Sequence, residues 1–141
     1  MLRWPLLAGL VAVLVAGSWL TARLVSADSA SRLRGRKGCP VGAKPLPSNA
    51  LAPAVSAALS ETPTLYRGLD THGARAIRAY RAEARGDRSA QVRHYCGAET
   101  QRRTVVIDLE FPEMAPSASL EQGSVFVSRF RNRYRVWQVA H

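Results

Sequence analysis

A stretch without a single charged side chain, residues 4–20, restricts the fold of this chain more than any other feature. Such a segment is too apolar for a small soluble domain and instead indicates a signal peptide or a membrane anchor. The rest of the chain is long enough for one domain with a modest core. We therefore predict three parts: a signal peptide or transmembrane anchor at 1–27, a tether rich in Arg, Pro, Gly and Ser at 28–51, and a compact extracytoplasmic domain at 52–141.

The sequence leaves two fates open for the N-terminal segment. Residues 6–17 have the length of the apolar core of a secretory signal, and an acceptable small-residue cleavage site ends at Ala27. An uncleaved anchor fits equally well, because residues 4–20 lie at the lower limit for spanning a hydrocarbon core about 30 Å thick. In either case we expect contact with the membrane through residues 4–25.

Two features disagree about the side of the membrane on which the domain lies. Basic residues that follow the apolar segment would keep the domain in the cytoplasm by the positive-inside rule. The two cysteines, Cys39 and Cys96, form an even count behind an export signal, which indicates a disulfide and an oxidising compartment. Because long domains cross membranes despite flanking charge, we give the cysteines more weight. The expected location is the cell membrane or the secreted fraction, with the domain extracytoplasmic.

The apolar pattern predicts an α+β domain. High Ala and Leu content favours a helix from about Ala52 to Ser60, which Pro63 would end. Residues 71–85 fit either a helix or a strand that pairs with residues 90–96, and helix propensity favours the helix. From residue 90 onward we predict β-structure.

The clearest strand signal is Arg103–Phe111, in which apolar residues alternate without a break. Further strands are predicted near 124–130 and 134–140, with a tight turn at 131–133 in which Asn132 tolerates positive φ. Three or four consecutive strands with short links form an antiparallel meander, and one or two helices would pack on one of its faces.

The predicted hairpin tip is the sharpest candidate for a binding site. A guanidinium binds carboxylates and phosphates through a planar fork, and a nearby aromatic ring adds stacking. At an extracytoplasmic surface the partner would be an anionic lipid, a wall polymer or an acidic protein, whereas nucleic acid is not expected. The residues concerned are Arg129, Arg131, Arg133, Arg135 and Trp137.

A solvated hairpin tip is the competing interpretation of the same arginines, which would then pair with acidic residues on neighbouring strands. The candidate acidic partners are Asp108, Glu110 and Glu121. A second basic stripe has helical spacing and consists of Arg75, Arg78, Arg81, Arg85 and Arg88. The net charge of +10 suits an anionic partner, but an Arg-rich genome explains it as well.

Residues able to do acid–base or nucleophilic chemistry are few. His94 and Cys96 would share a face of a predicted strand, but a disulfide at Cys96 removes the nucleophile. Asp108 and Glu110 also share a strand face, where carboxylates usually pair with arginine. No nucleotide, cofactor or metal-binding motif is present. We therefore predict a non-enzymatic accessory or binding domain without cofactor or metal, the alternative being a small extracytoplasmic enzyme with a site around His94, Asp108 and Glu110.

Overall fold

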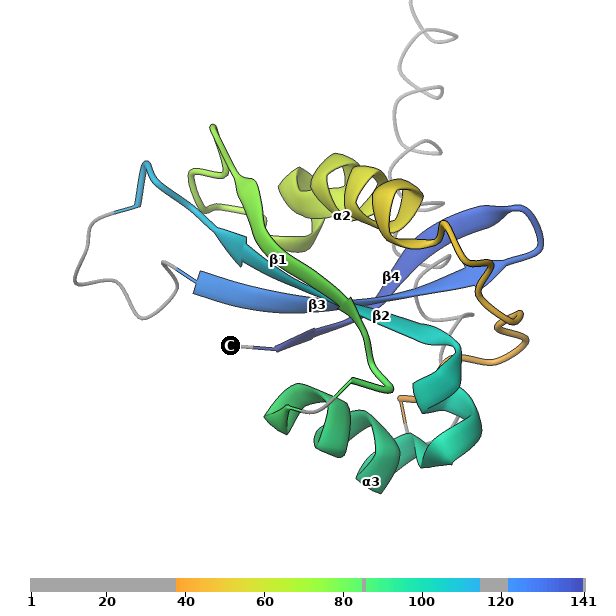
Figure 1. The fold of residues 1–141 in the computed structure, drawn as a ribbon. Helices are drawn as coiled ribbons and strands as arrows, with labels where there is room; N and C mark the ends of the chain where they lie inside the picture. Colours follow the sequence, from red (N-terminus) through yellow and green to blue (C-terminus); the bar gives the residue numbers. More distant parts are fainter. Residues whose placement is uncertain (1–37, 85, 115–121, 141) are drawn as a thin grey trace, which may run out of the picture. The chain divides into compact units, whose positions relative to one another are not determined.

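Two helices and a four-stranded antiparallel sheet make up the part of the chain that the structure describes, which confirms the predicted α+β class. The structure, a computed structural model, describes residues 38–84, 86–114 and 122–140 (Figure 1). The strands follow one another across the sheet in the order β1-β2-β3-β4, as a meander does. The elements are α2 (Leu51–Leu65), β1 (Arg75–Arg81), α3 (Asp87–Arg102), β2 (Thr104–Glu110), β3 (Gln122–Phe130) and β4 (Arg133–Ala140).

The main core lies between α2 and one face of the sheet. The alternating side chains of β2 supply its centre, because Val105, Ile107 and Leu109 all point to this face and are completely buried. Ala54 and Ala58 lie four residues apart on α2 and face them. Since alanine has only a methyl group, the helix packs close to the strands.

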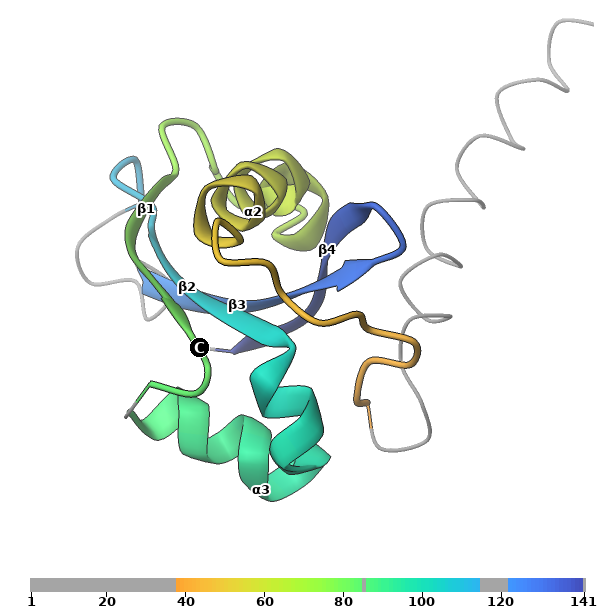
Figure 2. The same cartoon turned by 45° about the vertical axis from the view of Figure 1, so that its right-hand side comes forward.

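Helix α3 covers part of the opposite face, so the helices lie on both sides of the sheet and not on one side as predicted (Figures 1 and 2). A smaller core forms there from Val92 of α3, Val106 of β2, Phe126 of β3 and Trp137 of β4. The rings of Phe126 and Trp137 are 5.6 Å apart between centroids. The strand side chains that point away from the main core therefore form a second apolar layer under α3.

Residues 75–81 form an edge strand, so the favoured helix over 71–85 is wrong and the strand alternative is correct, although the strand pairs with β2 and not with residues 90–96. Ala76 and Ala79 pack against the main core, and the strand pairs with β2 in antiparallel register. Arg75 and Arg78 reach carboxylates across the strand pair, with Arg78 opposite Asp108. Burial and cross-strand pairing outweigh the helix propensity of Ala and Arg, as tertiary contacts commonly do.

Residues 87–102 form α3, so the strand predicted from residue 90 is wrong as well. Ser89, Val92 and Cys96 are three and four residues apart and lie on one face of the helix, where Ser89 and Val92 are buried. Gly97 has a φ of 85° and kinks the helix directly after Cys96. Residues two apart on a helix do not face each other, so His94 and Cys96 do not form the side-by-side pair expected of a strand.

Helix α2 extends further than predicted, and Pro63 lies inside it. The Thr62 hydroxyl donates to the Ala58 carbonyl at 2.8 Å, and the Tyr66 N–H donates to the Thr62 carbonyl at 3.0 Å. These bonds lie on both sides of Pro63, which itself has no N–H to donate. Pro63 therefore stands in the last turn instead of marking the end of the helix.

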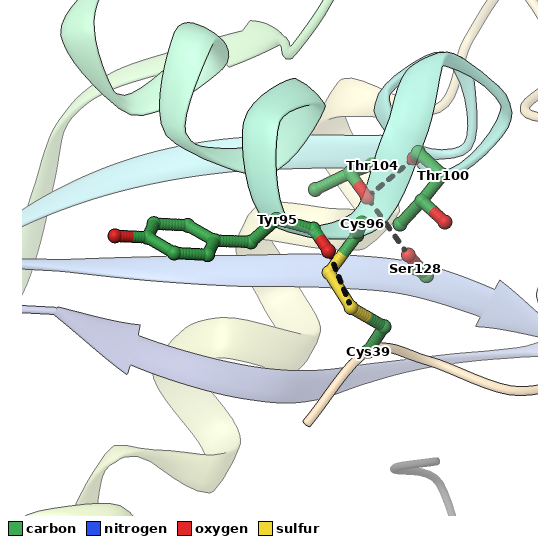
Figure 3. Close-up of a disulfide and its surroundings, with 6 residues drawn as sticks. All are labelled: Cys39, Tyr95, Cys96, Thr100, Thr104 and Ser128. Carbon is green, nitrogen blue, oxygen red and sulfur yellow. Dashed lines mark hydrogen bonds between the residues drawn. A yellow bond between two sulfur atoms is a disulfide. The ribbon is translucent and has the colours of Figure 1, made fainter. Parts of the chain in front are cut away.

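The predicted disulfide between Cys39 and Cys96 is present, with the two Cα atoms 5.6 Å apart (Figure 3). It attaches the predicted tether to α3 at the kink. Nearby, the Thr104 hydroxyl contacts the Thr100 carbonyl at 2.8 Å and the Ser128 hydroxyl at 3.3 Å. The disulfide thus lies beside the junction of α3 with β2.

The N-terminal segment, including the predicted membrane contact at 4–25 and the cleavage site at Ala27, lies outside the described residues. Within the described part of the chain, neither helix has the length and apolar character needed to cross a membrane.

Candidate functional site

The β3–β4 hairpin, which carries the predicted arginine cluster, projects beyond α2 (Figure 1). Phe130 pairs with Arg133, so the turn consists of Arg131 and Asn132. The positive φ of this turn, 53°, belongs to Arg131 and not to Asn132 as predicted. A non-glycine residue with positive φ is uncommon, and here it directs the chain back along the sheet.

The arginines of the hairpin do not all share one face. Arg129 lies opposite Tyr134, which packs against the main core, whereas Arg133 lies opposite Phe130, one position further along. Successive positions on a strand point to opposite faces, so Arg129 and Arg133 are on different sides of the hairpin. With Arg131 at the apex, the three cations surround the end of the hairpin instead of lining one surface.

Arg135 is engaged by α2 and does not contribute a free charge to the tip. Its Nε donates to Glu61 at 2.9 Å. Burial raises the pKa of Glu61, although the charge of Arg135 and the Val136 N–H lower it in part. The ion pair between Glu61 and Arg135 links α2 to the outer edge of β4.

Trp137 lies in the interior. Its exposed fraction is 3%, and it packs on Phe126 in the smaller core. A bulge explains this position: Phe126 pairs with Gln138 and Val127 with Val136, which leaves Trp137 as the extra residue of β4. The ring is consequently not placed to stack on a ligand at the hairpin tip.

Lys44 joins the arginines from the predicted tether, which the sequence pattern did not reveal. Its N–H donates to the Arg129 carbonyl at 2.7 Å in an antiparallel bridge. Residues directly opposite in such a bridge share a face, so Lys44 lies on the same side as Arg129. Nearby, Arg103 Nη1 donates to the Ala43 carbonyl at 2.6 Å and helps hold this segment. We call Lys44, Arg129, Arg131 and Arg133 the tip cluster.

No carboxylate among the described residues forms an ion pair with the tip cluster. The two predicted partners within the described residues, Asp108 and Glu110, pair with Arg78 and Arg75 of β1, and Glu121 lies outside the described residues. The Nε of Arg129 is buried and has no hydrogen-bond acceptor in the described part of the chain. Buried donors normally have a partner, so this N–H is an unsatisfied donor within the described residues.

The second basic stripe does not exist as a single helical surface, because Arg75, Arg78 and Arg81 belong to β1 whereas Arg88 belongs to α3. Arg75 and Arg78 are ion-paired, and the hydrogen bond to Asp108 raises the pKa of Arg78. Arg81 donates to backbone carbonyls, including that of Leu46 at 3.4 Å, while Arg88 donates to a glutamine side chain. Arg85 lies outside the described residues.

The residues named for a possible enzyme are spread over two elements. His94 is exposed on α3, with its ring against Tyr95, whereas Asp108 and Glu110 lie on β2 in ion pairs with arginine. The Cys96 sulfur is bonded to the Cys39 sulfur in the disulfide. Among the residues that the structure describes, no group of three or more His, Cys, Asp or Glu side chains could hold a metal ion.

Comparisons of this chain with protein-family models, with curated proteins and with solved structures find no match. Its function is therefore inferred from the residues described above.

Proposed function

We propose that this chain is a non-catalytic binding domain, held at or exported across the cytoplasmic membrane by residues 4–25, whose tip cluster contacts an anionic lipid surface. The observation that carries this proposal is the set of cations at a projecting turn, without a carboxylate partner among the described residues. The Cys39–Cys96 disulfide supports an oxidising, extracytoplasmic compartment.

The expected strength of the contact suits a tethered domain better than a free one. A basic residue near an anionic membrane contributes about 1 kcal/mol, so four contribute about 4 kcal/mol. That free energy corresponds to a Kd of about 1 mM. A short flexible linker supplies an effective concentration in the millimolar range, which is enough to occupy such a site about half of the time. A domain anchored by residues 4–25 would therefore rest on its own membrane, whereas the same domain in solution would bind poorly.

Chemical modification of arginine side chains tests this proposal on the full chain. The protein is placed in nanodiscs of phosphatidylglycerol or of phosphatidylcholine and treated with an arginine-selective dicarbonyl reagent, and the products are located by mass spectrometry. Arg131 and Arg133 should react more slowly in the anionic discs. Arg67 and Arg93, which are exposed and have no ion pair among the described residues, are internal controls and should react equally in both.

High salt should remove the protection, because charges are screened over about 8–10 Å at physiological ionic strength and over less when salt is added. Equal modification of Arg131 and Arg133 in both discs would contradict the proposal. Protection of Arg67 and Arg93 to the same degree as the tip arginines would also contradict it, since the contact would then be a general attraction of a basic protein.

A further inference from the structure

A groove of about 790 Å³ opens on the face of the sheet that carries α3, away from the tip cluster. Small-molecule sites commonly have volumes of about 300–1,000 Å³. The side chains that matter for its chemistry are Ile77, Arg78, Tyr80, Arg88, Asp108 and Ser124.

The groove exists because α3 covers only part of this face. Val106 of β2 is buried in the smaller core with Val92 of α3. Two positions further along the same face of β2, Asp108 lines the groove and interacts with polar partners. The strand thus changes from an apolar layer under the helix to a polar surface beyond it.

A bulge in β1 turns two neighbouring side chains into the groove. Ala76 and Ala79 pack against the main core on the other face, and the register shifts between Ala76 and Arg78. Both Ile77 and Arg78 consequently line the groove, although neighbours on a regular strand point to opposite faces. Bulges of this kind re-aim side chains and are common next to binding sites. Ile77 is 49% exposed, so its aliphatic side chain is accessible to a ligand in the groove.

Arg78 is held in place by its neighbours. Its Nε donates to one oxygen of Asp108 at 2.8 Å, and the Ser124 hydroxyl donates to the other at 2.8 Å. The guanidinium carbon lies 5.0 Å from the centre of the Tyr80 ring. Both carboxylate oxygens of Asp108 are therefore engaged, and this side chain is only 16% exposed.

The guanidinium of Arg78, by contrast, is open to the solvent. Its side chain is 70% exposed, and the bond from Nε leaves N–H groups on the two terminal nitrogens for a second acceptor. Arg88 on the adjoining turn of α3 adds a second cation to the lining. The groove thus offers fixed donors beside an exposed aliphatic side chain.

We propose that this groove binds a small ligand that carries one oxyanion, a carboxylate or a phosphate, next to an apolar group. Arg78 and Arg88 would bind the oxyanion, and Ile77 would contact the apolar part. Asp87 and Asp108 also line the groove and balance the two arginines, which favours a single oxyanion over a polyanion. This site is independent of the lipid contact proposed for the tip cluster.

The two isoleucines of the chain provide a reporter and a control for a binding experiment. Ile77 lies in the groove, and Ile107 is completely buried in the main core. The full chain, labelled at the isoleucine δ-methyl groups and held in phosphatidylcholine nanodiscs, is titrated with benzoate, phenyl phosphate or benzamide. Benzoate or phenyl phosphate should shift the Ile77 signal and leave Ile107 unchanged, and the stronger of the two identifies the oxyanion. Binding of benzamide as strong as that of both anions, or equal shifts at both isoleucines, would overturn the proposal.

Arg75 provides a matched control for Arg78. Both are exposed arginines of β1 paired with a carboxylate of β2, but only Arg78 lines the groove. Arg78→Gln should weaken binding about tenfold or more, as expected for loss of a charge-assisted hydrogen bond, and Arg75→Gln should leave it unchanged. If Arg78→Gln moves the Ile107 signal and is therefore misfolded, Arg88→Gln replaces it and should also weaken binding. Equal affinity of parent and folded groove variant, or equal loss in Arg75→Gln, would refute the site.

Discussion

Removal of the Cys39–Cys96 disulfide should destabilise the domain by an amount that can be worked out from the length of the loop. The two cysteines are 57 positions apart. In the chain-entropy model, closing a loop of this length in the unfolded state stabilises the folded state by about 4 kcal/mol at 25 °C. Domains of this size have total stabilities of about 5–15 kcal/mol. The bond therefore accounts for a large share of the stability expected here.

The assay compares the full chain with the Cys39→Ser/Cys96→Ser variant by denaturation with guanidinium chloride and by heating, followed by circular dichroism. A loss of about 4 kcal/mol corresponds to a fall in Tm of roughly 15–30 °C for a domain of about 100 residues. The parent protein under reducing conditions should behave like the double variant. Each single variant should also match it, because either substitution breaks the same bond. A loss below about 1 kcal/mol, or single losses that add up, would refute the loop-closure reasoning.

Two further predictions concern packing and titration. In Gly123→Ala the new Cβ would lie 2.5 Å from the Tyr66 hydroxyl oxygen. Urea denaturation should therefore show a fall of about 1–3 kcal/mol in the free energy of unfolding. Adding Tyr66→Phe should restore most of this free energy, and no recovery would disprove the clash. Burial is the largest cause of the raised pKa of Glu61, so its ionised form disfavours folding. The unperturbed pKa of Glu61 is 4.5. Glu61→Gln should therefore gain stability relative to the parent as the pH rises from below 4.5 through the raised pKa of the folded state. A difference in urea midpoints that stays constant or shrinks would contradict this.

The meander could be predicted because its strands carry their own signals. Val105, Ile107 and Leu109 alternate with residues that face the other way, and a burial pattern with a period of two identifies a strand without knowledge of its neighbours. The disulfide could be predicted for a similar reason, since a pair of cysteines leaves one possible partner for each.

The errors fall where local preference and tertiary contacts disagree. Residues 75–81 are rich in Ala and Arg, which favour a helix, but small side chains at Ala76 and Ala79 also fit beneath the main core when the segment pairs with β2. In α3, the spacing of Ser89, Val92 and Cys96 is a helical signal that the sequence already contains. The β-structure predicted from residue 90 onward overlooks this spacing.

The tip arginines were found from the sequence, but their surroundings were not. The alternation of strand residues could have shown that Arg129 and Arg133 face opposite ways. The bridge that brings Lys44 to Arg129 and the bulge that exposes Ile77 both depend on contacts between distant segments. Neither leaves a pattern in the residues around it.

The ion pair between Glu61 of α2 and Arg135 of β4 joins residues 74 positions apart, from the first and last elements of the described domain. Val136 of β4 is also part of the core that α2 covers. A nascent chain that has not yet reached β4 therefore has an α2 without a complete surface to pack on. Because domains generally fold as units, the packing of α2 is completed only once β4 is available.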